Sequence, residues 1–184
     1  MTAPEWLPPG LGERVTVYPG RAEWLEARNG EGHTVGGTTA AALLGSSPWA
    51  GPWDVWAEAH APEEGKPRDQ SNAATRAGVL WEPYVVSAYA ETRAAEVWAP
   101  LAIASAEGRP WARGSFDGIT RRDGEIGILE IKCPYRRDDW GKDGEIAHTA
   151  ADLVCPVYYA IQCYWYLAVS GLPWADVVAF FGPH

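Results

Sequence analysis

The stretch GSFDGITRRDGEIGILEIKCP, residues 114–134, decides the fold and the chemistry that we expect of this chain. Its second part, residues 125–134, is the clearest strand prediction in the sequence, and residues 114–119 are a second candidate strand. Asp123 and Gly124 between them are typical of a tight hairpin turn. We therefore predict an antiparallel hairpin that returns the second strand beside the first.

Acidic and basic side chains gather on this predicted hairpin. The turn can bring Asp117 near Glu130 across the two strands. Because side chains alternate along a strand, Glu130 and Lys132 share one face, while Ile131 points to the other and keeps its backbone carbonyl available. Two carboxylates and a carbonyl are ligands that Mg²⁺ or Mn²⁺ prefers. A lysine two residues further on can position or activate an attacking water.

Phosphodiester hydrolysis needs these residue types. It places negative charge on the phosphoryl oxygens, which a divalent ion neutralises while it lowers the pKa of a bound water. Lys132 adds a fixed positive charge, or a base if its pKa is depressed. A glutamate and a lysine on one strand face also form ordinary ion pairs, so the pattern alone leaves both interpretations open.

The rest of the chain predicts a single α/β domain over residues 20–184, with an irregular, Pro- and Gly-rich arm at 1–19. A loop is expected at 61–71. Further strands are expected at 96–98, 102–105 and 175–181, and helices at 20–29, 40–44, 53–60, 72–93 and 156–170.

Local signals refine two of these helices. Thr38 or Thr39 can cap the helix at 40–44, and Gly45 can end it. Pro83 interrupts the long helix at 72–93, where it marks a kink or a first turn.

Composition limits the function classes. A formal net charge of −9 counts against nucleic acid, although the objection weakens for an enzyme that gathers carboxylates around divalent cations. Basic pairs at 121–122 and 136–137 flank the hairpin, as DNA contacts or as solvated turns.

No apolar run is long enough to span a membrane, and no signal peptide is evident. Three cysteines without a CxxC pair indicate a reducing cytoplasm and argue against a structural zinc or a four-cysteine cluster.

The acid followed by Glu-x-Lys at a strand end resembles the signature of the PD-(D/E)XK nuclease superfamily, with Phe116 in place of the proline. More specifically, the chain resembles the YqaJ-type viral recombinases, relatives of the lambda phage exonuclease. Four segments match in order, namely 24–28 with 35–38, 78–83, 115–118 with 129–134, and 159–162. The resemblance implies a restriction-endonuclease-like core, a central mixed sheet flanked by helices.

The resemblance also implies a role for each site residue. One metal ion would be bound by Asp117, Glu130 and the Ile131 carbonyl. Glu82 on the long helix would help hold a second ion, and two such ions typically lie roughly 3.5–4 Å apart. Lys132 would address the nucleophilic water, making it catalytic together with the acids. Gln162 of the Tyr-x-x-Gln motif would support the site and the DNA strand.

Three further residues, Arg28, Thr38 and Ser115, match positions that grip the 5′-phosphate of a DNA end. Thr38 is followed by Thr39 where the family usually has Ser-Asp or Ser-Glu. The stretch 29–34 also looks longer than usual. Thr38 keeps the hydroxyl that a phosphate contact needs.

The expected function is a 5′→3′ exonuclease on double-stranded DNA ends, in phage-type recombination or repair. Its implied partners are DNA ends, a single-strand annealing protein and further copies of the chain, which form trimers in relatives of lambda exonuclease.

The alternatives are a restriction-like endonuclease with the same metal site and a non-catalytic DNA-binding module. An end-gripping pocket favours the exonuclease, and the intact Asp117, Glu130 and Lys132 favour an enzyme. Cas4-type nucleases use a cysteine-ligated cluster, for which three cysteines are too few.

Overall fold

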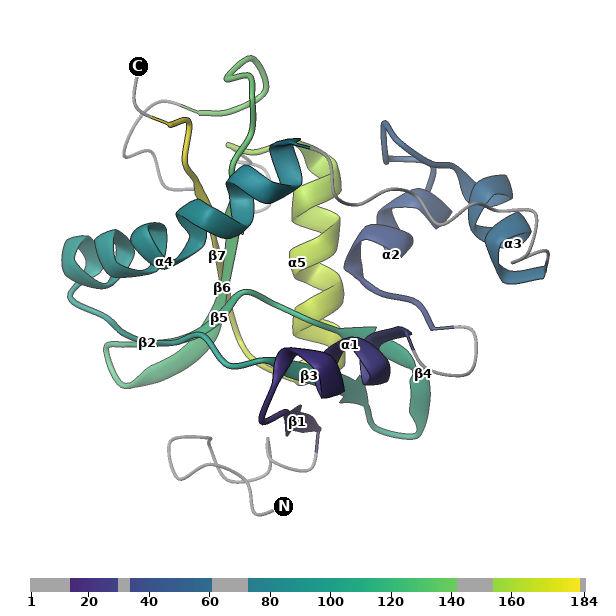
Figure 1. Ribbon diagram of the computed structural model, residues 1–184, viewed down its shortest axis with the longest axis horizontal. Helices are drawn as coiled ribbons and strands as arrows, with labels where there is room; N and C mark the ends of the chain where they lie inside the picture. Colours follow the sequence, from purple (N-terminus) through teal and green to yellow (C-terminus); the bar gives the residue numbers. More distant parts are fainter. Residues whose placement is uncertain (1–13, 30–33, 61–72, 142–153, 183–184) are drawn as a thin grey trace.

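The structure is a computed structural model that describes residues 14–29, 34–60, 73–141 and 154–182. Within these residues the chain forms two β-sheets and five α-helices (Figure 1). None of these helices is long and apolar enough to cross a membrane. The α/β class expected from the sequence is confirmed.

The larger sheet has four strands in the order β2-β5-β6-β7. Its strands are β2 (Glu96–Trp98), β5 (Gly118–Arg122), β6 (Glu125–Lys132) and β7 (Ala175–Ala179). The hairpin between β5 and β6 is confirmed: Asp123 and Gly124 have φ angles of 54° and 83°, which suit a tight two-residue turn. Because β7 runs parallel to β6 and the other pairs are antiparallel, the sheet is mixed.

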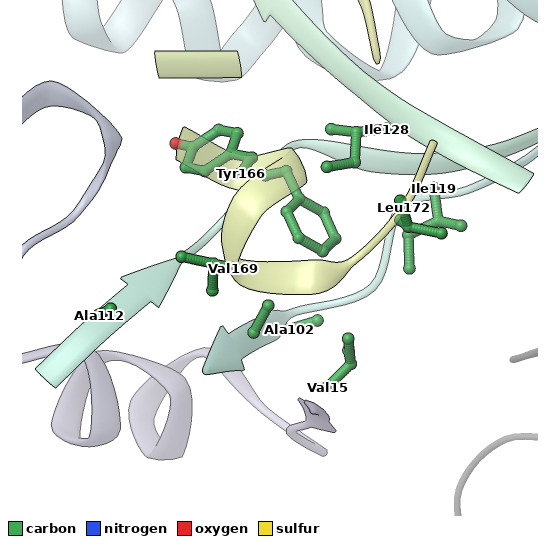
Figure 2. Packing of buried hydrophobic residues seen from close by; sticks show 10 residues of the cluster. Val15, Ala102, Ala112, Ile119, Ile128, Tyr166, Val169 and Leu172 are labelled. Atoms are coloured by element: carbon green, nitrogen blue, oxygen red, sulfur yellow. The ribbon is translucent and has the colours of Figure 1, made fainter. Parts of the chain in front are cut away.

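The longest helices, α4 (Ala73–Arg93) and α5 (Val157–Ser170), pack against this sheet. Leu129 and Ile131 belong to one apolar cluster with Val85 of α4. Ile128 belongs to another with Val169 of α5, and Figure 2 shows this second cluster around the helix. Successive residues of β6 therefore face different helices, which places Glu130 and Lys132 on the α5 side.

The second sheet has the order β1-β3-β4, with β1 (Val15–Val17), β3 (Ala102–Ala106) and β4 (Arg109–Gly114). Part of the expected irregular arm is thus a strand, since β1 pairs with β3 and Val15 is buried in the core. The arm's residues 1–13, like the loop expected at 61–71, lie outside the described residues.

The expectation of one strand over residues 114–119 is wrong. Strand β4 ends at Gly114 and β5 begins at Gly118, so the chain leaves one sheet and enters the other between them. Packing explains the break. A Cβ atom on Gly114 would lie 2.9 Å from a ring atom of Tyr166, and the buried Phe116 meets the same ring edge-on at a centroid distance of 5.9 Å. The crossing puts Asp117 directly before the first residue of β5.

Helices α1 (Arg21–Asn29), α2 (Gly37–Leu43) and α3 (Pro52–His60) complete the described part of the fold. Helix α2 begins three residues before the expected start at 40. Its N-cap is Gly36, which makes no side-chain cap hydrogen bond, so the predicted threonine cap is wrong. Gly45, with a φ of 66°, follows the helix end as expected. Helix α4 continues through Pro83, as an interior proline and not as a first turn.

Candidate active site

The β5–β6 hairpin sets two carboxylates opposite each other. Gly118 pairs with Leu129, so the next step of the register places Asp117 across from Glu130. The Ile131 backbone N–H donates a hydrogen bond of 2.7 Å to Asp117 Oδ2. The predicted proximity of the two acids therefore follows from strand pairing, and Asp117 is fixed to β6 by its own carboxylate.

Glu130 lies at the centre of a buried polar group. Its side chain is only 2% exposed. Lys132 Nζ donates to Glu130 Oε1, and Gln162 Nε2 donates to the same oxygen at 2.6 Å. The second hydrogen of Gln162 Nε2 serves the Tyr166 hydroxyl at 2.7 Å. Among the described residues, Glu130 Oε2 has no hydrogen-bond partner.

The charges of this group do not balance. Burial raises the pKa of Glu130 to about 7; the Asp117 charge adds to the rise and the Lys132 charge opposes it. Burial also raises the pKa of Asp117, although Lys132, the Ile131 N–H and Arg28 lower it. The pKa of Lys132 is raised, because the two acids outweigh the effect of its burial. The nearby positive charges thus do not offset the effect of burial on the pKa values of the two acids.

Glu82 of α4 belongs to the same electrostatic neighbourhood. Burial raises its pKa first, the charge of Asp117 raises it further, and Arg21 and Lys132 lower it. In the ranges that the structure describes, however, no three Asp, Glu, His or Cys side chains converge tightly enough to form a metal-binding group. The structure therefore brings Asp117 and Glu130 together and leaves Glu82 outside their immediate group.

The residues present fit a hard divalent cation. Two carboxylates meet in register, burial raises the pKa values of both, and one buried oxygen has no partner among the described groups. Carboxylate oxygens are the ligands that Mg²⁺ and Mn²⁺ prefer.

Two of the three residues predicted to grip a 5′-phosphate, Arg28 and Ser115, lie near Asp117. Arg28 stacks on Trp24, with its guanidinium carbon 4.9 Å from the ring centroid. Trp24 Nε1 and Ser115 Oγ both donate to the Ala102 carbonyl at 3.3 Å, so Ser115 and the tryptophan on which Arg28 stacks meet at one backbone group. Thr38 is exposed in the first turn of α2. Its convergence with Arg28 and Ser115 stays a prediction.

Two residues near the acids were not identified from the sequence. Tyr166 lies one helical turn after Gln162, and Arg21 lies one turn before Trp24, with its guanidinium carbon 5.9 Å from the Trp24 ring centroid. The only signal in the sequence was their spacing of three or four residues from Gln162 and Trp24, which puts them on the same helix faces. Nothing local distinguishes them, because their relation to the site depends on how α1 and α5 pack.

Comparison with known proteins now places the chain. Residues 23–173 match the family model of the YqaJ-like viral recombinase domain. The chain belongs to this family. The expected family is thereby confirmed. No curated protein matched the chain.

Two solved structures similar to this YqaJ-family chain are both of LHK-Exo, an alkaline exonuclease from Laribacter hongkongensis. The structure in complex with dAMP has 24% identity and a TM-score of 0.64; the other has 23% identity and a TM-score of 0.63. Each likeness covers 86% of this chain and 73% of that one. At these identities the likeness shows that the fold is shared.

Proposed function

We propose that this YqaJ-family protein is a metal-dependent DNA exonuclease that hydrolyses phosphodiester bonds at double-stranded ends. One observation carries the proposal. Glu130 is buried opposite Asp117, with Oε2 lacking a hydrogen-bond partner among the described residues and with its pKa raised to about 7. A buried acid of this kind is costly for the fold, and it is useful where it binds a cation. The fold shared with an alkaline exonuclease supports the same reading.

In this proposal Asp117, Glu130 and the Ile131 carbonyl hold Mg²⁺, for which Mn²⁺ can substitute. Glu82 is the candidate for holding a second ion, which its raised pKa and its electrostatic coupling to Asp117 support. When bound, such ions stabilise the charge on the phosphoryl oxygens and lower the pKa of a bound water. A restriction-endonuclease-like PD-(D/E)XK core is the corresponding proposal for the fold, built on the mixed sheet between α4 and α5.

Lys132 and Gln162 have different roles in this proposal. The raised pKa of Lys132 keeps its ammonium group charged at neutral pH, which favours a fixed positive charge near the reacting phosphate over a role as base. Gln162 holds Glu130 Oε1 in place, which leaves the second oxygen to face a ligand. Both residues thus preorganise the charges before DNA arrives.

For the DNA end we propose that Arg28, Ser115 and Thr38 bind a terminal 5′-phosphate, which gives 5′→3′ polarity. The guanidinium of Arg28 offers a planar pair of donors and is already oriented by its stacking on Trp24. Three further proposals rest on the family alone. They are a role in phage-type recombination, a single-strand annealing partner and a trimeric assembly.

The test compares three substrates with and without Mg²⁺: a linear duplex with 5′-phosphates, the same duplex with 5′-hydroxyls, and a closed circle. Strands labelled at either end report the polarity. The 5′-phosphorylated duplex should be degraded fastest and only with Mg²⁺, while the circle survives. Rapid cutting of the circle, without an effect of the 5′ group, would make the protein an endonuclease.

A variant pair tests the phosphate pocket. Arg28→Ala should erase most of the preference for a 5′-phosphate, by about tenfold or more, because it removes charge-assisted hydrogen bonds to one end only. Arg121→Ala is the matched control. Arg121 also stacks on a tryptophan, Trp98, at 5.2 Å, but it lies on β5 near the hairpin turn and should leave the preference unchanged.

A further inference from the structure

An aromatic cluster borders the candidate active site on the side of Lys132. We name it the Trp49 cluster. Its members come from the segment between α2 and α3, the segment after β6, the first turn of α5 and the segment after β7. They are Trp49, Trp140, Tyr158, Tyr159 and Phe181.

The rings form one connected surface. Tyr159 is its centre, with ring centroids of Tyr158, Trp140 and Trp49 at 4.4, 5.5 and 6.4 Å. Trp49 meets Tyr158 edge-on at 4.9 Å, and Trp140 meets Phe181 at 6.0 Å. Tyr159 also links the cluster to the acids, because Lys132 Nζ lies 5.1 Å from its ring centroid.

This surface is not part of the folded core. Neither of the two clusters of buried apolar residues includes any of its rings. Trp49 is 60% exposed, and its four partners are only half-buried. Connected aromatic surface that a protein leaves exposed commonly marks a place where a ligand or partner binds.

The charges around the cluster help to identify its ligand. Lys132 lies at one edge, and Arg137 lies at the other, with its guanidinium carbon 4.5 Å from the Phe181 ring centroid. Asp138 and Asp139 follow Arg137 in the chain, so the outer edge is mixed in sign. The rings, more than net positive charge, are what this surface offers a ligand.

We propose that the Trp49 cluster is a stacking site for unpaired nucleobases of the strand being cut. The proposal rests on the proposed function, which is what places a DNA strand beside Lys132. Inside a duplex the base faces cover one another, so away from the terminal pair a base can stack on protein rings only where the strand is unpaired. Such stacking is tolerant of sequence, since every base has a π face.

The test measures binding in an Asp117→Asn background, which keeps DNA uncut. The probes are a fluorescein-labelled oligothymidylate and a matched oligonucleotide with abasic sites. The protein should bind the base-containing probe about tenfold more tightly than the abasic probe. Trp49→Ala should remove most of this difference and Trp49→Phe should restore much of it. The logarithmic salt dependence should stay unchanged, because no phosphate contact is lost.

Trp111→Ala is the matched control. Trp111 is 48% exposed and contacts another tryptophan, Trp165, at 6.2 Å, but it lies on β4 in the other sheet. It should keep the preference for the base-containing probe. Circular dichroism checks that each variant is folded.

The outcomes separate the two proposals. If the wild type degrades DNA but Trp49→Ala still discriminates between the probes, the stacking site is wrong and the nuclease stands. If the base preference is present and depends on Trp49 but no DNA is ever cut, the nuclease assignment fails, and the Trp49 cluster stands as a base-stacking site without the link to cleavage. If Trp49→Ala dissociates an oligomer and leaves the base preference intact, the cluster is an interface between copies and the stacking proposal is overturned.

Discussion

Two acidic side chains on neighbouring strands of the larger sheet have opposite environments. Asp176 of β7 accepts a hydrogen bond of 2.7 Å from the Tyr89 hydroxyl and another of 2.7 Å from Arg122 Nη1. Both donors reach the same oxygen, and Arg122 is further held over the Trp174 ring at 4.6 Å. Glu130 of β6 is more deeply buried, yet Oε2 has no partner among the described groups and its pKa is raised to about 7.

The comparison separates an acid whose partners the protein itself supplies from an acid that we propose to bind a cation. Asp176 ties α4 and β5 to β7 through partners that the protein itself supplies. Glu130 is placed just as firmly, by Lys132 and Gln162, but Lys132 also interacts with Asp117 and burial still raises the pKa of Glu130 to about 7. A buried acid with a raised pKa costs stability, which supports the proposal that a bound cation completes this site. The two sites should therefore respond differently to the same substitution.

The largest effect is expected from Asp117→Asn. The asparagine oxygen can still accept the hydrogen bond from the Ile131 N–H, so the fold should persist while the negative charge is lost. Cleavage should fall by on the order of 10³-fold, which corresponds to several kcal/mol of lost transition-state stabilisation. Time courses on a labelled duplex measure it, with excess EDTA giving the same loss in the wild type.

Asp123→Asn is the matched control for this change. Asp123 sits in the hairpin turn with a φ of 54°, a conformation that asparagine tolerates well. Its activity should match the wild type. Full activity of Asp117→Asn, or of the wild type in EDTA, contradicts the account.

Lys132→Met should have the next largest effect. Methionine removes the charge but keeps much of the length of the side chain, so packing against Tyr159 can persist. We expect kcat to fall by about a hundredfold or more with little change in KM, since the interaction matters mainly in the transition state. Steady-state kinetics separate the two constants. A raised KM with an unchanged kcat would instead make Lys132 a binding contact for phosphate.

The third prediction concerns pH. A divalent cation needs Glu130 ionised, and its pKa is about 7, so protons compete with the cation below neutrality. At limiting Mg²⁺, cleavage should fall by about tenfold from pH 8 to pH 6, following the ionised fraction. Saturating Mg²⁺ should reduce the fall. A Mg²⁺ requirement that is unchanged over this range contradicts the assignment of Glu130 as a ligand.

The smallest effect is expected at Asp176. Asp176→Asn removes the charge that holds Arg122 but leaves one acceptor oxygen, so unfolding should become easier by about 1–2 kcal/mol, given the partial exposure of the pair. Cleavage should change less than about twofold. Glu96→Gln, in an exposed pair with Arg121, is the control and should cost less than about 0.5 kcal/mol. Urea unfolding measures both, and a large loss of cleavage in Asp176→Asn would erase the distinction between the two sites.

The sequence predicted the local features of the fold well. The hairpin turn at Asp123 and Gly124, the long α4 and the paired faces of β6 follow from periodicity and turn chemistry, which a sequence carries directly. It did not predict the break after Gly114 or the early start of α2 at Gly37. Both depend on close packing against α5, where a Cβ on either glycine would meet Tyr166 within 3 Å.

The candidate site likewise has features that the sequence predicted and features that it did not. Glu130 and Lys132 share a face because the strand period is two, and Asp117 joins them through the hairpin. The depth at which Glu130 is buried, its bond to Gln162 and the nearness of Arg21 to Glu82 come from helices packing on the sheet. Such contacts between distant segments leave no periodic trace in a single sequence.

One measurement tests the central claim most directly: calorimetric titration of the metal-free protein with Mn²⁺. The wild type and Asp176→Asn should bind the ion, whereas Glu130→Gln and Asp117→Asn should lose most of that binding while remaining folded. Equal Mn²⁺ binding by the wild type and Glu130→Gln, or no binding by the wild type at all, would contradict the claim that Asp117 and Glu130 form a cation site.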